Sequence, residues 1–246
     1  IPTHLATILL FDSMTGELMA IMDGRYITEA RTAAVSAVAT ELLARDDAGV
    51  LAVIGSGVQA RSHVDAIARV RDVRTIRAWS PNPERLATFV RETQPRTGAA
   101  VTPCASARAA VEGADIVVLA TSALEPVIES GWIADGTHVC AVGACRPDQR
   151  EMDTALVARA RVFVDSRAGA RAESGDLLVP MREGAFDETH ILGELGEVAA
   201  GRVSGRRSAA DVTIFKSLGM AVEDVAAAHL AYDKAAERGL GRGFVL

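Results

Sequence analysis

Short apolar runs alternate with amphipathic segments over most of the chain, and this alternation predicts a mixed α/β fold. The runs have the length and apolar content of strands and lie at residues 50–54, 75–79, 99–102, 115–120, 137–142 and 161–164. Helical patterns begin between them, at Val58, Pro83 and Ala105. Strands separated by helices require crossover connections, which build a parallel sheet covered on both faces. We therefore predict a doubly wound α/β domain over residues 47–211.

The two ends of the chain follow another pattern. Residues 5–11 and 18–22 predict two strands joined by a turn, and an alanine-rich helix is expected from Tyr26 to Leu43. Residues 212–239 form one long helical pattern. We predict that residues 1–46 and 212–246 together form a second α+β domain, into which the doubly wound domain is inserted.

Composition and charge exclude several classes of protein. Hydrophobic residues make up 49% and charged residues 24%, as in ordinary globular chains. The net charge is −6 without a basic stripe, so we expect no nucleic-acid partner, and no apolar run is long enough to span a membrane. The three cysteines and five histidines lack metal or disulfide spacing, so we predict no metal site and a cytoplasmic location.

A glycine-rich loop follows the first strand of the doubly wound segment. The sequence Gly55-Ser56-Gly57-Val58-Gln59-Ala60 has the form G-x-G-x-x-A and leads into a helix. The first glycine allows a tight turn, the second lets the backbone approach a pyrophosphate, and the alanine allows close packing of helix on strand. The strand before and the helix after make this a Rossmann-type dinucleotide site rather than a simple turn.

The end of the next strand bears on the choice of cofactor. An acidic residue about 20 positions after the loop would bind the ribose 2′-hydroxyl of NAD, but this strand ends at Ser80. The serine removes repulsion toward a 2′-phosphate, and Arg85 or Arg77 is a candidate partner for that group. Glu84 argues the other way. The sequence favours NADP(H), and NAD(H) stays open.

Two further strand ends carry small or polar residues. Thr121 and Ser122 follow one strand, and Gly143 follows the next. Ligands of open α/β sheets bind at the carboxyl ends of strands. We therefore predict that Thr121 and Ser122 contact the cofactor and that Gly143 lets the backbone approach the nicotinamide; plain turns are the alternative.

Three stretches together resemble the ornithine cyclodeaminase and mu-crystallin family. They are residues 12–18 with Arg31-Thr32-Ala33-Ala34, the loop 55–60, and residues 213–219 with Glu223-Asp224. The resemblance extends over the whole chain. It implies a homodimer that uses NAD(P)(H) on small amino or imino acids, with a substrate-binding and dimerisation domain formed by the two ends of the chain.

The resemblance also assigns roles to residues. It implies that Arg31 holds the substrate carboxylate, as a planar guanidinium can, together with basic residues upstream of Ile1, where family chains normally extend further. It places Lys216, Ser217 and Leu218 at a turn facing the nicotinamide. The helix-cap role of Ser217 is the competing interpretation.

Cys145 departs from the pattern of the true cyclodeaminases, which have an aspartate there as acid–base group. A cysteine exchanges protons with an amine poorly at neutral pH, and Ala144-Cys145-Arg146-Pro147-Asp148 is more similar to the mu-crystallin side of the family. We predict an NAD(P)H-dependent oxidoreductase that reduces a small imino acid, such as a ketimine, or dehydrogenates an amino acid. The alternatives are an ornithine cyclodeaminase and a non-enzymatic protein that binds NADPH and a small ligand.

Overall fold

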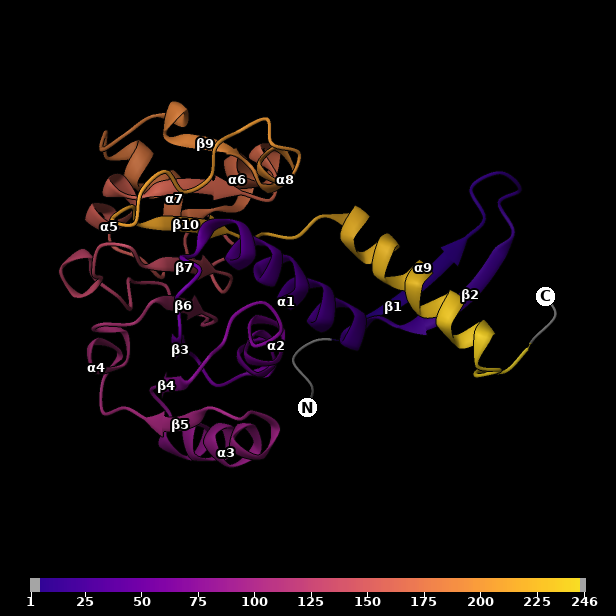
Figure 1. Ribbon diagram of the computed structural model, residues 1–246. Helices are drawn as coiled ribbons and strands as arrows, with labels where there is room; N and C mark the ends of the chain where they lie inside the picture. Colours follow the sequence, from indigo (N-terminus) through magenta and orange to yellow (C-terminus); the bar gives the residue numbers. More distant parts are fainter. Residues whose placement is uncertain (1–4, 244–246) are drawn as a thin grey trace. The chain divides into compact units, whose positions relative to one another are not determined.

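The computed structural model describes residues 5–243. Contacts divide the chain into two units, with residues 33–219 in the larger one (Figure 1). The described part of the smaller unit consists of residues 5–32 and 220–243. Helix α1 (Gly24–Leu43) begins in the smaller unit and ends in the larger.

The larger unit is built on an eight-stranded parallel sheet with the strand order β5-β4-β3-β6-β7-β10-β8-β9. The strands are β3 (Val50–Ile54), β4 (Thr75–Trp79), β5 (Ala100–Pro103), β6 (Ile116–Leu119), β7 (His138–Ala141), β8 (Arg161–Val164), β9 (Ile191–Glu194) and β10 (Thr213–Lys216). The order reverses at β3, because the chain first builds β4 and β5 on one side and then continues with β6 and β7 on the other. A crevice for ligands forms at such a reversal.

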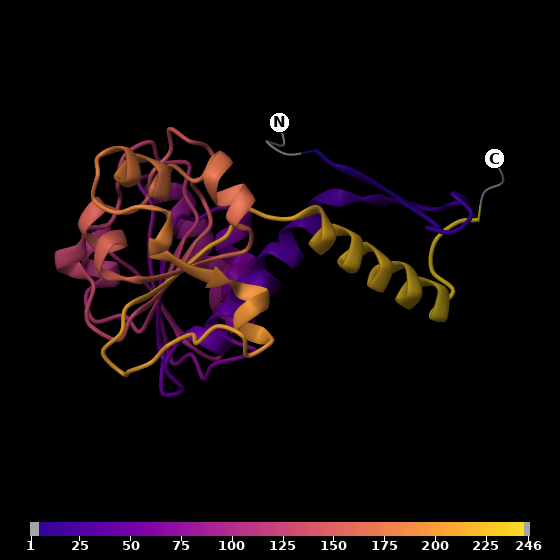
Figure 2. The ribbon, with the colours of Figure 1, turned by 90° about the horizontal axis from the view of Figure 1, so that it is seen from above.

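Helices cover both faces of this sheet, so its central strands are buried throughout (Figure 2). Ala52 and Ile54 point into a core formed with the helices of one face, and Leu51 and Val53 into a core on the other. The helices are α2 (Val58–Ile67), α3 (Pro83–Thr93), α4 (Ala107–Val111), α5 (Thr154–Arg159), α6 (Arg167–Glu173), α7 (Gly175–Arg182) and α8 (Leu195–Ala199), with short 3-10 turns at Gln94–Arg96, Ser130–Trp132 and Glu188–His190.

Local side chains determine where several of these helices begin. The side chains of Asn82, Ser106, Asp153 and Ser166 each accept a hydrogen bond from the first turn of the helix that follows. Such caps satisfy backbone N–H groups that have no partner within the helix.

The described part of the smaller unit consists of an antiparallel hairpin, the start of α1 and a second helix. Strands β1 (Thr7–Phe11) and β2 (Leu18–Asp23) pair Leu9 with Ile21, and α9 spans Ala221–Glu237. Leu10 packs with Ile27 and Ala228 in a small core. Several large apolar side chains of this unit face solvent, namely Leu5, Leu9, Phe11, Met14, Ile21, Tyr26, Val222, Val225 and Leu230.

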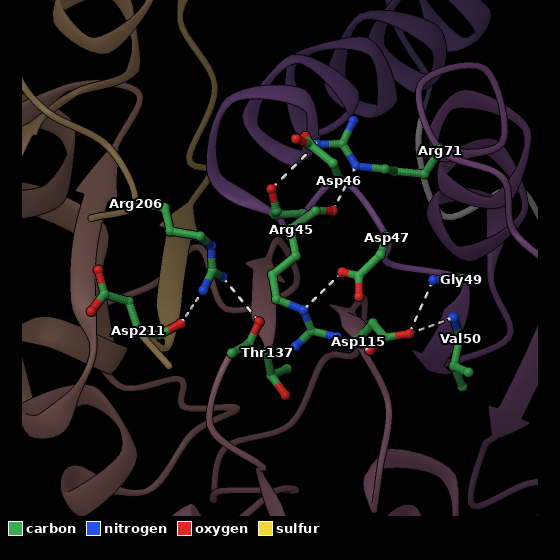
Figure 3. Close-up of polar contacts among 12 residues, drawn as sticks. Arg45, Asp46, Asp47, Gly49, Val50, Arg71, Asp115, Thr137, Arg206 and Asp211 are labelled. Atoms are coloured by element: carbon green, nitrogen blue, oxygen red, sulfur yellow. Dashed lines mark hydrogen bonds and ion pairs between the residues drawn. The ribbon is translucent and has the colours of Figure 1, made fainter. Parts of the chain in front are cut away.

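Two half-buried arginines, Arg71 and Arg206, bind the end of α1 near the amino ends of the strands (Figure 3). The Arg71 guanidinium donates to the carbonyl oxygens of Thr40, Glu41, Ala44 and Arg45, which lie at or just beyond the last turn of the helix. Arg206 donates to the carbonyl of Leu43 at 2.7 Å and to that of Gly136 at 3.0 Å. These bonds satisfy carbonyl groups that a helix end leaves without partners.

The predicted doubly wound α/β fold is confirmed, but the unit boundaries differ from the predicted 47–211. Residues 33–46 and 212–219 belong with the sheet, because Ala39 and Leu43 pack on Phe163 and Phe215 and because β10 lies between β7 and β8. The prediction of one helix over residues 212–239 is therefore wrong at its start, where β10 precedes α9 (Ala221–Glu237). A central strand is buried on both faces, so its continuous apolar run reads like a buried helix.

Candidate functional site

The glycine loop turns sharply between β3 and α2. Gly55 has a φ of +114°, which side-chain-bearing residues rarely adopt, and a Cβ added there would lie 2.3 Å from the carbonyl oxygen of Ala120 at the end of β6. Its N–H donates to the carbonyl of Trp79 at 2.8 Å, at the end of β4. Gly55 thus lies at the end of β3, between the ends of β4 and β6, where there is no room for a side chain.

Gly57 is the residue before α2, and its surroundings are open. A Cβ added there would meet no atom within 4 Å, and no side chain caps the helix. Val58 is exposed and Gln59 half-buried, whereas Ala60 is completely buried against the sheet. The N-terminal N–H groups of this ten-residue helix therefore face an open region, which is the geometry of an anion site.

The second predicted contact region lies beside this loop. The Ser56 hydroxyl donates to the Ser80 oxygen at 3.0 Å, so the structure brings these two predicted cofactor residues together. Arg85 lies in the first turn of α3, and its side chain is exposed. Arg77, the other candidate partner of a 2′-phosphate, donates from its guanidinium to the carbonyl of Glu112 at 2.6 Å.

At the ends of β6 and β7, a residue that the sequence did not single out holds the predicted ones. Both carboxylate oxygens of Glu151, a fully buried residue, accept hydrogen bonds. Oε1 accepts from the N–H and the hydroxyl of Thr121 at 2.7 and 2.8 Å, and Oε2 accepts from the N–H groups of Gly143 and Ala144 at 2.8 and 3.1 Å. The Thr121 hydroxyl therefore donates its proton inside the protein. Ser122, the next residue, is exposed.

Gly143 has a reason to be glycine other than the predicted approach to nicotinamide. A Cβ at this position would lie 2.0 Å from the carbonyl oxygen of Thr121 and 2.5 Å from Glu151 Oε1. The close approach of two strand ends around the Glu151 carboxylate therefore excludes any side chain here.

Lys216 ends β10, and its side chain points into the protein. It is fully buried, and its Nζ lies 3.2 Å from Oδ2 of the equally buried Asp176. Lys216 thus forms an internal ion pair, and its expected role at the turn facing the nicotinamide stays a prediction. Ser217 is buried and Leu218 half-buried, and the carboxylate of Asp165 accepts from the N–H groups of Leu218 and Gly219 at 2.5 and 2.6 Å. These bonds fix the turn after β10.

Cys145 lies in the loop after β7, close to this cluster. Its thiol donates to the carbonyl of Val142 at 3.2 Å, and its N–H donates to Gln149 at 3.2 Å. Burial raises the pKa of the Cys145 thiol, while the charge of Lys216 opposes that shift. The thiol is therefore neutral near pH 7.

Arg31 lies in the smaller unit, on α1. Its Nε and Nη1 atoms pair with Asp224 at 3.1 Å and Glu223 at 3.0 Å, two acids in the first turn of α9. The structure thus joins two of the sequence stretches that carry the family resemblance. Nη2 lies outside both ion pairs.

Comparison with known proteins identifies the family of this chain. The sequence profile of the ornithine cyclodeaminase/mu-crystallin family matches residues 1–239. The ketimine reductase mu-crystallin of Mus musculus is 44% identical over 235 residues, which are 95% of this chain and 70% of that protein. The chain belongs to the ornithine cyclodeaminase/mu-crystallin family.

Solved structures of this family have the same fold. The Δ1-pyrroline-2-carboxylate reductase of Thermococcus litoralis, in complex with NADH and L-proline, superposes with a TM-score of 0.97 at 43% identity, over 99% of this chain and 76% of its own. An archaeal alanine dehydrogenase dimer with bound NAD superposes with a TM-score of 0.94 at 31% identity, over 100% of this chain and 76% of its own. The predicted family and Rossmann-type fold are confirmed.

Only part of the site could be recognised before the structure. The glycine loop has a local signature, but Glu151 and Asp176 lie in no motif with an assigned chemistry, and nothing in the local sequence shows that they are buried. The apolar neighbours of Asp165, Val162 to Val164, are a signal that could have indicated its burial at a strand end. Within residues 5–243, no group of His, Cys, Asp and Glu residues could hold a metal ion, and no helix is long and apolar enough to cross a membrane.

Proposed function

We propose that the chain is an NAD(P)H-dependent reductase of a small cyclic imino acid, of the ketimine or Δ1-pyrroline-2-carboxylate type. Relatives that share 44% and 43% of its sequence are a ketimine reductase and a Δ1-pyrroline-2-carboxylate reductase. The observation that carries the proposal is the glycine loop at the reversal of strand order, where Gly57 and the uncapped start of α2 face open space.

The described residues fit a dinucleotide. A side chain at position 57 would fill the open space before α2, so the glycine and the helix N-terminus together suit a pyrophosphate. Residues 55–60 would hold that group, Ser56 and Ser80 the adenosine side, and the ends of β6 and β7 the other half. When bound, the reduced cofactor supplies a hydride to the imine carbon.

Cys145 supports reduction over cyclising deamination. Its thiol is neutral and already donates to the carbonyl of Val142. A neutral thiol cannot pair with the ammonium group of ornithine as a carboxylate would, so the site lacks the acid–base group that the resemblance assigns to the cyclodeaminases.

Arg31 is proposed to bind the substrate carboxylate. Glu223 and Asp224 hold its Nε and Nη1 atoms and thereby orient the planar guanidinium, while Nη2 lies outside those pairs. A fixed guanidinium donates to a carboxylate with little loss of conformational freedom.

The test is an assay with three substrates. With Δ1-pyrroline-2-carboxylate as substrate, the absorbance of NADPH or NADH should decrease and proline should form. Ornithine with catalytic NAD⁺ should yield no proline. Proline from ornithine would identify a cyclodeaminase. Tight cofactor binding without turnover of an imino acid, or of alanine with NAD⁺, would identify a binding protein instead.

We also propose that NADPH binds more tightly than NADH. Ser80, which bonds to Ser56 beside the glycine loop, offers no negative charge to a 2′-phosphate, and the exposed Arg85 on α3 is the cation available to it. Titration of tryptophan fluorescence with each cofactor tests the proposal, since Trp79 ends β4 next to Ser80. Tighter binding of NADH would overturn it, and Arg85→Gln should weaken NADPH alone.

We propose that the protein is a homodimer and that it resides in a reducing compartment. The alanine dehydrogenase relative is a dimer, and the smaller unit exposes large apolar side chains on its hairpin and on α9. Such a set of apolar side chains marks an association surface. Cys104, Cys140 and Cys145 are all free thiols, which suits a cytoplasmic protein.

A further inference from the structure

Buried carboxylates outnumber buried cations at the carboxyl ends of the central strands. In the described part of the chain, the charged residues that the fold buries are Glu151, Asp165, Asp176 and Lys216. Glu151, Asp176 and Lys216 are completely buried, and Asp165 is 3% exposed. Three buried carboxylates therefore accompany one buried ammonium group in the protein interior, where charges are screened less than in water.

The bonding of Glu151 favours its ionised form. Three of its four hydrogen-bond partners are backbone N–H groups, which can only donate, and they reach both oxygens. A proton on either oxygen would point at one of these donors. Burial and the nearby charge of Asp176 raise the pKa of Glu151, while the charge of Lys216 and the bonds from Thr121 oppose this shift.

Asp176 links Glu151 to Lys216. Its Oδ1 accepts from the N–H groups of Glu151 and Met152 at 2.8 and 3.1 Å, and its Oδ2 pairs with Lys216 Nζ. Asp165 in turn accepts from Ser166, Leu218 and Gly219. Every one of these acids is held by donors, so the excess of negative charge is part of the fold.

The topology places this charge relative to a bound dinucleotide. The pyrophosphate belongs at the end of β3 and the adenosine half beside Ser80 at the end of β4. The nicotinamide half must then extend to the opposite side, over the ends of β6 and β7. Those are the ends that Glu151 joins, through Thr121, Gly143 and Ala144.

We propose that the network of Glu151, Asp176 and Lys216 is an electrostatic positioning device beneath the nicotinamide, which favours the oxidised over the reduced cofactor. The inference rests on the proposed function. The nicotinamide ring is neutral when reduced and becomes cationic when a hydride, with its two electrons, leaves for the carbon of the protonated imine, whose C=N π electrons become the nitrogen lone pair of the neutral amine. A buried excess of negative charge stabilises that cation and so promotes hydride transfer to the imino acid.

The test measures the dissociation constants of the oxidised and reduced cofactor, and two substitutions should change their ratio in opposite directions. Asp176→Asn removes a negative charge and keeps the oxygen that accepts from Glu151 and Met152, so binding of the oxidised form should weaken about tenfold relative to the reduced form. Lys216→Met removes the only positive charge of the network and should shift the ratio by a similar factor the other way. The double variant keeps the net charge and should return close to the wild-type ratio.

Controls separate charge from structural damage. Damage would weaken both cofactor forms alike, whereas the proposal requires shifts of opposite sign. Asp148→Asn, an exposed acid of the Cys145 loop, should leave the ratio unchanged because water screens its charge. Lys216→Met, measured by itself, still requires a shift toward the oxidised form, should Asp176→Asn fail to fold.

Two failures are distinguishable. Shifts in the same direction for both single variants, or no shift in either, would overturn the electrostatic role while leaving the dinucleotide site intact. If the wild-type chain binds neither cofactor form, the proposed function fails and the electrostatic role fails with it.

Discussion

The two glycines of the phosphate loop occupy different surroundings. Gly55 needs its positive φ and touches the Ala120 carbonyl, whereas Gly57 faces open space. The sequence motif does not distinguish between these two glycines. The structure therefore separates a glycine required by the fold from one required by the ligand.

Gly55→Ala and Gly57→Ala should accordingly differ in kind. The first should destabilise the protein by roughly 1–3 kcal/mol, because of backbone strain and the contact with Ala120. The second should keep nearly the wild-type stability but bind NADPH at least about tenfold more weakly, since its Cβ would stand where the backbone meets a pyrophosphate. Urea denaturation and fluorescence titration measure the two effects; equal loss of stability in both variants would contradict this interpretation.

Cys145 offers a gain-of-function prediction at the same scale. Cys145→Asp supplies the carboxylate that the resemblance assigns to the cyclodeaminases, in a loop whose backbone N–H groups donate to Glu151 and Gln149. Proline formation from ornithine with catalytic NAD⁺ should rise from none to a measurable rate. Cys145→Ser is the matched control and should form no proline. If the aspartate variant folds and binds cofactor but forms none, position 145 does not decide the reaction.

At the scale of elements, a chain of buried polar groups joins α1 to the sheet and to α2. His63 on α2 lies 2.9 Å from the Ser36 hydroxyl, and His138 on β7 lies 3.3 Å from the Cys140 sulfur, which contacts Thr40 of α1. Burial lowers the pKa of His63 to about 4. Burial, with the charges of Arg206 and Arg71, lowers that of His138 to about 3.

The free energy of unfolding of the larger unit should therefore decrease as the pH drops below about 6.5. Both histidines have a lower pKa in the folded than in the unfolded state, so the unfolded chain takes up protons first as the pH falls. The stability is fully present above the unfolded value and is lost toward pH 4, by up to ~1.4 kcal/mol per pH unit for each histidine. Urea denaturation at several pH values measures this slope, and His63→Gln should reduce it by about one proton. An unchanged slope would show that His63 is not the titrating group.

At the scale of the whole molecule, the two ends of the chain meet in one unit. The ion pairs of Arg31 with Glu223 and Asp224 span more than 190 positions of sequence and lie within the smaller unit. Because only about 15% of the Arg31 side chain is exposed, these pairs are partly shielded from water.

Arg31→Ala should lower kcat/KM for the imino acid roughly ten- to hundredfold through the loss of one charge-assisted contact. Cofactor affinity should stay near wild type, since the cofactor residues lie in the larger unit. Arg31→Lys, which keeps the charge but not the planar fork, should recover part of the loss. Normal substrate kinetics together with weak NADPH binding would reverse the assignment.

The exposed apolar side chains of the smaller unit predict its association. Leu9 and Ile21 are opposite each other on the solvent-facing side of the hairpin, and each is more than half exposed. Ile21→Lys should convert a dimer into monomers, as measured by light scattering after size-exclusion chromatography. Leu124→Lys, at an exposed leucine of the larger unit, is the control and should remain dimeric. A dimeric Ile21→Lys would place the association surface elsewhere.

The sequence alone determined the parts of this protein whose signals are local. Strand and helix periodicity predicted the parallel sheet, and the spacing of Gly55, Gly57 and Ala60 predicted the phosphate loop, because each depends on neighbours a few residues away. Tertiary structure alone decided the insertion of β10 between β7 and β8, because a strand buried on both faces loses the alternation that marks a strand. It also decided the burial and pairing of Glu151, Asp176 and Lys216, since contacts across 25 and 40 positions leave no trace in local sequence.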